Sequence, residues 1–264
     1  MISGRTRIFA IIADPVAHVR TPQALNALFE QQGQDAIIVP LQIAAADLET
    51  GIAGLRAMRN LGGLVVTVPH KSAMAALCDR LSERARLAGA VNVVRRETDG
   101  ALAGDLLDGE GFAAGLERAG VSLAGSSAFL AGAGGAASAI AFALAERGVA
   151  RLTIANRSQD RAEALARRLA PLFSGLAIST EAGPEDHDIA INATSLGLKD
   201  GDPLPFDPAR LPAGALVTEV VMQPDITPLL EAARERGLAI QPGKRMLDGQ
   251  LDAICDFLTG GGHG

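Results

Sequence analysis

The strongest constraint on the fold of this chain is a strand–helix–strand pattern near its middle. The apolar run SAFLAGAGG (127–135) is followed by an alanine-rich stretch, AASAIAFALAERG, and then by a second β-rich run, ARLTIANRS (150–158). This order predicts two parallel strands joined by a helix. Short β-rich runs also alternate with longer amphipathic stretches elsewhere in the chain. We therefore predict an α/β protein built on parallel sheets.

The alternation restarts after residue 103, and a length of 264 residues favours two domains of ordinary size. Strands are predicted at 7–12, 36–43, 61–68, 91–96, near Leu102, 127–135, 150–158, 188–194 and 214–221. Helical periodicity is clear at 226–237 and 244–259, and a further helix is expected to begin near Thr21. We place the domain limits after residues 103 and 238.

Composition excludes several classes of function. The net charge of −6 argues against a nucleic-acid partner, because such proteins usually carry a basic face. No apolar run approaches the roughly 20 residues of a membrane helix, and IFAIIA is too short for a signal peptide. Cys78 and Cys255 lie far apart without metal-ligand spacing, so we expect structural thiols and no metal site. We expect a soluble, cytoplasmic protein that is a monomer or a homodimer.

A glycine-rich turn follows the first strand of the central pattern. Gly132, Gly134, Gly135, Ala136 and Ala137 give the spacing GxGxxA. In dinucleotide-binding folds the first glycine permits a tight turn, the second lets a pyrophosphate approach, and the small last residue allows close helix packing. The alternative is a packing seam of small residues in an alanine-rich chain. The position between a strand and a helix favours the nucleotide site.

The end of the next strand indicates which dinucleotide binds. Enzymes that prefer NAD usually carry an acid there, whereas this chain has Asn156, Arg157 and Ser158, with Arg161 one turn further on. Two guanidinium groups suit the 2′-phosphate of NADP. The alternative is that both arginines are solvated surface charges. We predict NADP as the cofactor, bound by the glycine-rich turn and these four residues.

Two charged residues are candidates for moving a proton when a hydride moves. Lys71 follows the apolar run GLVVTV, at the strand end where ligands of α/β sheets gather. Asp108, in GDLLDGEGF, opens a predicted helix. Each has a structural alternative, because Lys71 could be a solvated residue of a first helical turn and Asp108 an ordinary N-cap. Taken separately, neither residue is assigned a role by the sequence.

Together with their neighbours, these residues resemble the motifs of the shikimate dehydrogenase family in order and spacing. The matching segments are HVRTPQALN (18–26), VTVPHK (66–71), LAGAVN (87–92), DGEGF (108–112), AGAGGAA (131–137), INATSLGL (191–198), ITPLL (226–230) and MLDGQL (246–251). They cover nearly the whole chain, and so many ordered matches are far more specific than any one of them. The chain is therefore identified as a diverged member of this family.

The resemblance implies an N-terminal α/β substrate domain (1–103), a C-terminal Rossmann-type NADP domain (104–238) and a last helix (within 239–264) that returns to the first domain. It implies that Lys71 and Asp108 flank the reacting alcohol, with the hydroxyl proton moving toward Lys71 and Asp108 orienting both groups. Substrate contacts are implied at Val19, Thr21, Thr67, Asn92 and Gln250. Further cofactor contacts are implied at Thr194, Ser195, Val220, Gly243 and Met246.

Several substrate positions depart from the family pattern in one direction. Where the family usually has two serines, this chain has Val19 and Thr21, and an expected asparagine is Val65. An expected asparagine and threonine are Leu106 and Leu107, and an expected tyrosine is Met222. Each lost hydrogen bond to a charged group costs roughly 1.5 to 3 kcal/mol, so two losses would weaken transition-state binding by about 10² to 10⁴-fold. Arg20 could compensate by meeting a carboxylate; its alternative is an exposed loop arginine.

We therefore predict an NADP-dependent oxidoreductase that keeps the chemistry of the family and recognises shikimate poorly. The alternative from another class is a noncatalytic NADP-binding or regulatory protein. The altered pocket favours that alternative, and the retention of Lys71 and Asp108 argues against it. A methylenetetrahydrofolate dehydrogenase has a comparable layout but pairs its lysine with a tyrosine, and this chain contains no tyrosine.

Overall fold

The computed structural model describes residues 2–17, 19–181 and 183–260. Two compact units make up the chain: one runs up to Leu107 and resumes at Leu251, and the other is Asp108–Gln250. The first unit extends past the predicted limit at residue 103 because β6 (Leu102–Asp105) pairs with β5 (Val93–Arg96). At the second limit, β12 (Ala239–Gln241) pairs with β11 (Leu216–Glu219), so these residues continue the second sheet.

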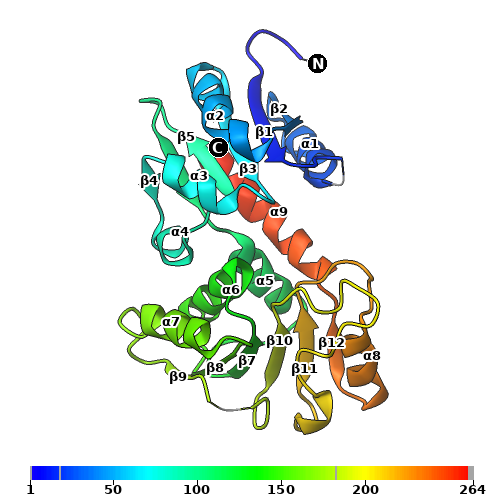
Figure 1. Ribbon diagram of the computed structural model, residues 1–264. Helices are drawn as coiled ribbons and strands as arrows, with labels where there is room; N and C mark the ends of the chain where they lie inside the picture. Colours follow the sequence, from blue (N-terminus) through cyan, green and yellow to red (C-terminus); the bar gives the residue numbers. More distant parts are fainter. Residues whose placement is uncertain (1, 18, 182, 261–264) are drawn as a thin grey trace. The chain divides into compact units, whose positions relative to one another are not determined.

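The sheet of the first unit has the strand order β2-β1-β3-β5-β6-β4 (Figure 1). Its remaining strands are β1 (Arg7–Ala13), β2 (Ala36–Gln42), β3 (Leu61–Val66) and β4 (Arg80–Leu81). β1 runs parallel to β2 and β3, but β5 runs antiparallel to β3 and β6, so the sheet is mixed rather than parallel as expected. The physical reason is the short turn between β5 and β6, which can join only antiparallel strands.

The helices of the first unit follow these strands along the chain. They are α1 (Thr21–Gln31), η1 (Ala45–Asp47, a 3₁₀ turn), α2 (Leu48–Ala57), α3 (Lys71–Leu77) and α4 (Glu83–Ala88). α1 begins where the sequence predicted, with proline in its first turn. The last helix, α9 (Lys244–Thr259), adds its final turns to this unit.

The core of the first unit confirms that the last helix returns to it. Ile254, Cys255 and Leu258 of α9 belong to the same buried cluster as Phe9 and Phe29, whose ring centroids lie 5.4 Å apart. At Gly63 in β3, an added Cβ would lie 2.8 Å from Leu258 Cδ2 and 2.3 Å from the carbonyl oxygen of Val94. Only glycine therefore allows the helix and the neighbouring strand to approach so closely.

The sheet of the second unit is parallel throughout, with the order β12-β11-β10-β7-β8-β9 (Figure 1). Its other strands are β7 (Ser127–Ala131), β8 (Arg151–Ala155), β9 (Ala177–Ser179) and β10 (Ile189–Asn192). The helices are α5 (Asp108–Arg118), α6 (Gly135–Glu146), α7 (Gln159–Leu169), η2 (Pro208–Arg210) and α8 (Pro228–Glu235). The strand order reverses between β7 and β10, and in such sheets ligands bind beyond the carboxyl ends of the strands at this point.

Candidate active site

The glycine-rich turn has the geometry that a phosphate-bearing ligand needs. Gly132 has φ +124°, and a Cβ there would lie 2.7 Å from the carbonyl oxygen of Ala193. Gly134 and Gly135, at the start of α6, differ because nothing lies within 4 Å of an added Cβ. A packing seam explains Gly132 but not these two open glycines, whose position at a helix N-terminus suits an anion. Ala136 is half-buried in the same first turn.

The end of β8 presents polar groups of the kind that the sequence predicted. Asn156 is half-buried, and its amide nitrogen donates to the carbonyl oxygen of Ser158 at 3.0 Å. Arg157, Ser158 and Arg161 are exposed. Within the described part of the chain, Arg157 and Arg161 form no ion pair, so their guanidinium groups are available for an anion. These residues therefore fit the 2′-phosphate of a dinucleotide.

The loop after β10 contacts the glycine-rich turn through Ala193 and carries Thr194 and Ser195. Thr194 donates through its backbone nitrogen and its hydroxyl to Asn192 Oδ1, at 3.0 and 2.7 Å. Ser195 is exposed. The loop therefore presents its residues from a backbone that is fixed by side-chain hydrogen bonds.

The ends of β11 and β12 also meet beyond the second sheet. Val220 is half-buried directly after β11, and a Cβ on Gly243 would lie 2.3 Å from the carbonyl oxygen of Val221. Met246 is buried in the first turn of α9, and its backbone nitrogen donates to Gly243. All the predicted cofactor residues thus lie in one unit, on the connections that leave the carboxyl ends of its strands.

Sequence reasoning missed a buried acid beneath these connections. Glu219, the last residue of β11, has no exposed surface, and its Oε2 accepts hydrogen bonds from Thr227 Oγ1 at 3.0 Å and Asn192 Nδ2 at 3.4 Å. Burial raises the pKa of Glu219 to about 7. The signal in the sequence was a single acid inside the apolar run GALVTEVV, since a charge is rarely buried without a reason.

Asp108 is held at the start of α5 by a side chain from the last helix. Gln250 Nε2 donates to Asp108 Oδ1 at 2.7 Å, and both residues are buried. The two helices can approach closely because Gly111 has no side chain. An added Cβ there would lie 2.5 Å from Gln250 Cβ. The structure therefore brings together one predicted catalytic residue and one predicted substrate residue, and the Asp108 carboxyl does more than cap a helix.

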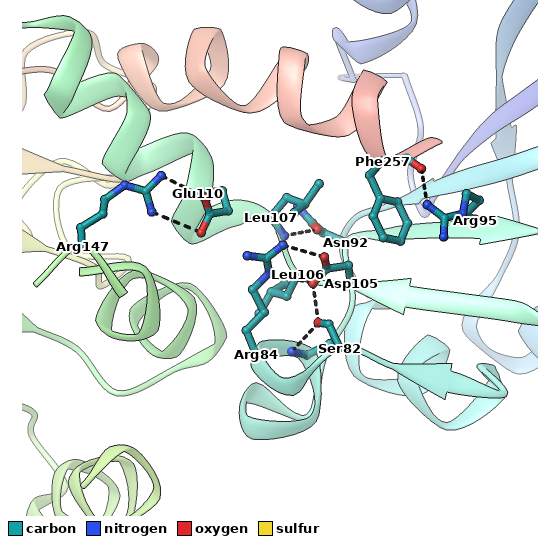
Figure 2. Close-up of polar contacts among 11 residues, drawn as sticks. Ser82, Arg84, Asn92, Arg95, Asp105, Leu106, Leu107, Glu110, Arg147 and Phe257 are labelled. Carbon is teal, nitrogen blue, oxygen red and sulfur yellow. Dashed lines mark hydrogen bonds and ion pairs between the residues drawn. The ribbon is translucent and has the colours of Figure 1, made fainter. Parts of the chain in front are cut away.

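α5 is also fixed against α6. Arg147 Nη2 lies 2.9 Å from Glu110 Oε2, and the pair is bidentate (Figure 2). A Cβ on Gly109 would lie 2.0 Å from the carbonyl oxygen of Ala139, so the helices touch at their backbones. The carboxyl of Asp108 therefore stands on a rigid pair of helices.

In the first unit, three predicted residues gather at the carboxyl end of β3. Lys71 is half-buried and begins α3, and its carbonyl oxygen accepts from the backbone of Val91 at 3.0 Å. Asn92 comes directly after Val91 in the chain, and its backbone oxygen accepts a hydrogen bond from the backbone nitrogen of Val66 at 2.7 Å. Thr67 is half-buried between these elements. Lys71 and Asp108 lie in different units, and their meeting around a substrate stays a prediction.

The residue before Lys71 anchors the start of α3. His70 is buried, and its Nε2 lies 2.8 Å from the carbonyl oxygen of Ile43. The helix therefore begins at a fixed point next to the loop that follows β2. This explains why a histidine stands between a cis-proline, Pro69, and the lysine.

A buried polar cluster fixes the segment that leads to Asp108. Asp105 accepts from Arg84 Nε at 2.8 Å, from Arg84 Nη2 at 2.7 Å and from the hydroxyl of Ser82 (Figure 2). Asn92 Oδ1 accepts from the backbone nitrogen of Leu107 at 2.7 Å. The oxygen of Asn92 thus serves the protein backbone, a role that its prediction as a substrate contact did not include.

The positions that depart from the family pattern are largely apolar and buried. Val65, Leu106 and Leu107 are 5%, 1% and 3% exposed, and Val65 and Leu107 belong to the core of the first unit. Val19 packs against the same core. Thr21 is half-buried at the start of α1, and His18 of this motif lies outside the described residues. Met222, where the family resemblance implies a tyrosine, is exposed.

In the described ranges, no helix is long and apolar enough to cross a membrane, and no three or more His, Cys, Asp or Glu side chains are grouped to hold a metal ion. Burial raises the pKa of both Cys78 and Cys255 to about 11. Both thiols are therefore mainly protonated at neutral pH, and the thiolate is the nucleophilic form.

Two family models match this chain. Residues 11–94 match the shikimate dehydrogenase substrate binding domain, and residues 115–196 match the shikimate / quinate 5-dehydrogenase model. Among curated proteins, a shikimate dehydrogenase (NADP(+)) of Rubrobacter xylanophilus is 45% identical over 93% of this chain and 88% of its own length.

Solved structures are similar over nearly the whole chain. Shikimate 5-dehydrogenase from Listeria monocytogenes, solved with shikimate and NAD, has a TM-score of 0.87 and 32% identity, covering 98% of this chain and 93% of its own. The ligand-free 5-ketofructose reductase of a Gluconobacter species has a TM-score of 0.86 and 32% identity, covering 98% and 94%. The two neighbours are thus named for different substrates.

Proposed function

Because the chain belongs to the shikimate dehydrogenase family, we propose that it transfers a hydride between NADP(H) and a secondary alcohol or ketone of a shikimate-like compound, and that its recognition of shikimate is weakened. The second part is supported by the apolar character of Val65, Leu106 and Leu107, buried positions at which the family resemblance implies polar residues. The enzyme is an oxidoreductase of the alcohol dehydrogenase type.

The cofactor would be held by residues of the second unit. The open backbone at Gly134 and Gly135 would receive the pyrophosphate, and Arg157 and Arg161 would pair with the 2′-phosphate. Bound there, NADP supplies the hydride acceptor or donor. The chain's own task is to orient the substrate alcohol and to move its proton.

The proton transfer falls to Lys71 and Asp108 in this proposal. Lys71 accepts the hydroxyl proton during oxidation and returns it during reduction, while Asp108 orients the lysine and the hydroxyl. The hydrogen bond from Gln250 supports this role because it leaves Asp108 one defined orientation in a buried position. Thr67 would contact a substrate hydroxyl from the first unit.

Substrate choice is where the chain departs from its relatives. Two lost hydrogen bonds to a carboxylate correspond to a loss of about 10² to 10⁴ in catalytic efficiency. Arg20 is exposed beside Val19 and Thr21 and forms no ion pair in the described ranges, so it is suited to meet an acidic substrate group directly. A noncatalytic role finds no support, since the relatives are named dehydrogenases.

The test is a panel of NADP⁺ reductions with shikimate, quinate and cyclic polyols, together with NADPH oxidations by keto acids and keto sugars. We expect turnover of at least one compound and a kcat/KM for shikimate below about 10⁴ M⁻¹ s⁻¹. A higher value for shikimate would contradict the weakened recognition. Absence of turnover across the panel would contradict the enzymatic function itself.

A further inference from the structure

Glu219 is a fully buried acid of the second unit that no role has yet explained. Its Oε1 makes no hydrogen bond within the described part of the chain. Its Oε2 accepts only from the neutral groups of Thr227 and Asn192. A buried acid without a cationic partner is costly, so its presence points to a role in what it touches.

The first contact leads to the loop after β10. Asn192 bonds Glu219 through Nδ2, and the same Nδ2 donates to the carbonyl oxygen of Leu196 at 3.0 Å. Its Oδ1 receives the two hydrogen bonds of Thr194. One side chain thus ties Glu219 to both ends of the loop, and Ala193 in that loop touches Gly132 of the glycine-rich turn.

The second contact leads to the start of α8. Thr227 is the N-cap of this helix, and its Oγ1 donates to Glu219 while accepting from the backbone nitrogen of Leu230. A Cβ on Gly197, which has φ +100°, would lie 3.3 Å from the Thr227 side chain. Thr227 therefore holds the far end of the same loop by direct contact.

The third connection is along the chain. Glu219 is followed by Val220 and Val221, and the carbonyl oxygen of Val221 abuts Gly243. The 193–197 loop is thus tied to this carboxyl through Asn192 and Thr227, the end of β11 follows it directly in the chain, and the turn at Gly243 abuts that end.

We propose that Glu219 is a positioning residue for the dinucleotide, fixing the 193–197 loop and the end of β11 in the shape that NADP requires before it binds. The proposal rests on the proposed function only in naming NADP as the ligand. Glu219 acts through Asn192 and Thr227 and does not touch the reacting atoms. A preformed loop raises affinity because binding then orders fewer groups.

The experiment compares NADP⁺ dissociation constants, measured by calorimetry on the full chain, for the wild type, Glu219→Gln, Glu219→Ala and Thr227→Val. Glutamine keeps the shape and the acceptor oxygen, so we expect a change below about threefold. Glu219→Ala loses both hydrogen bonds, and we expect its dissociation constant to rise roughly 5- to 30-fold. Thr227→Val should weaken binding about fivefold. The matched control is Glu231→Gln, an acid of α8 paired with Arg234 near the surface.

The readouts separate positioning from general structural damage. Glu219→Ala should change the KM for NADP⁺ while leaving the KM for the alcohol and the kcat within about twofold, and glutamine should rescue it. Equal effects on both KM values, or unchanged NADP⁺ affinity in Glu219→Ala and Thr227→Val, would overturn the proposal. If Glu219→Ala does not fold, Thr227→Val alone decides.

The outcome for the wild type tests the proposed function separately. If the wild type binds NAD⁺ but not NADP⁺, the cofactor assignment fails and the variants are compared with NAD⁺ instead. If it binds neither, both proposals fail. If it binds NADP⁺ but reduces no alcohol, the proposed function fails while the positioning role is still decided by the dissociation constants.

Discussion

The buried carboxyl groups of the two units have different kinds of hydrogen-bond partner. In the first unit, the carboxylate of Asp105 receives a bidentate pair of hydrogen bonds from Arg84, and the nearby positions 106 and 107 are leucines packed in the interior. In the second unit, Glu219 is buried with neutral donors only, and the glycine-rich turn leaves Gly134 and Gly135 open.

This comparison bears on where the predicted cofactor contacts and the predicted substrate contacts lie. The second unit carries the residues that we predict to bind the dinucleotide, at a sheet whose strand order creates a binding edge. The first unit carries the predicted site residues Lys71, Thr67 and Asn92, and it has apolar side chains at positions where the family resemblance implies polar ones. In the proposed function the cofactor contacts lie in the second unit alone, whereas the substrate would be met by residues of both units, Lys71 of the first and Asp108 with Gln250 of the second.

The largest effect is expected for Lys71→Ala. Without the proton acceptor we expect kcat to fall by at least about 10³-fold, in the upper range for a general acid–base group. The dissociation constant of NADP⁺, measured by calorimetry, should stay within about twofold, since the cofactor residues lie in the other unit. Residual turnover above about a tenth of the wild-type rate would contradict the role of Lys71, in the first unit, as the proton acceptor.

The next effect concerns pH and the buried acid of the second unit. The pKa of Glu219 is raised to about 7 by burial, and no charged side chain contributes to the shift. An unfolded glutamate titrates near 4.3, so between about pH 4.3 and 7 the folded protein binds more protons than the unfolded one. The free energy of unfolding should therefore fall as pH rises through this window, by up to about 4 kcal/mol, and level off above it.

Urea unfolding of the wild type and Glu219→Gln at pH 5 and pH 8 checks this expectation. The variant cannot ionise, so it should be the more stable protein at pH 8 and about equal at pH 5. A wild type whose difference from the variant is the same at both pH values would contradict the protonation of Glu219.

A smaller effect is expected at the end of β8. Replacing both Arg157 and Arg161 by alanine removes the charges that suit a 2′-phosphate, and the dissociation constant of NADP⁺ should rise about 10- to 100-fold. Binding of NAD⁺, measured in the same way, should change less than about twofold. Arg167→Ala on the same helix is the matched control. Equal losses for both dinucleotides would show that the arginines act on the shared part of the cofactor.

The smallest effect sharpens the comparison from the substrate side. The variant Val19→Ser adds the hydroxyl that is missing at this half-buried position, whereas Thr21 already carries one. We expect kcat/KM for shikimate to rise about tenfold, the worth of roughly one hydrogen bond to a carboxylate. Val19→Ala is the control, because it changes the size of the side chain without adding a donor. A rise in the control of the same size would assign the effect to space rather than to hydrogen bonding.

Features that depend on local pattern were predictable from the sequence. The strand–turn–helix at Gly132 was one, because apolar runs, small residues and helical periodicity act over a few neighbouring positions. The stop of α8 was another, since Gly237 takes φ +72° as a helix-ending glycine should. Strands β4, β9 and β12 were not predicted because two or three residues are too short to show a period.

Features that depend on tertiary contacts were not predictable. The antiparallel direction of β5 follows from a turn whose length matters more than its composition. The network of Asn192, Glu219 and Thr227 joins residues separated along the chain, and each looks ordinary alone. The same is true of Leu107, since the sequence shows a leucine but not that it faces the core. The surroundings of the predicted substrate residues were therefore the hardest feature to predict from the sequence.

The division between the units also has a topological meaning. The second unit is an insertion: the chain enters it at Asp108 and leaves it after Gln250, and these two end residues are clasped by their own hydrogen bond. The chain therefore enters and leaves the second unit at one place. The hydrogen bond that closes the insertion therefore belongs entirely to the second unit.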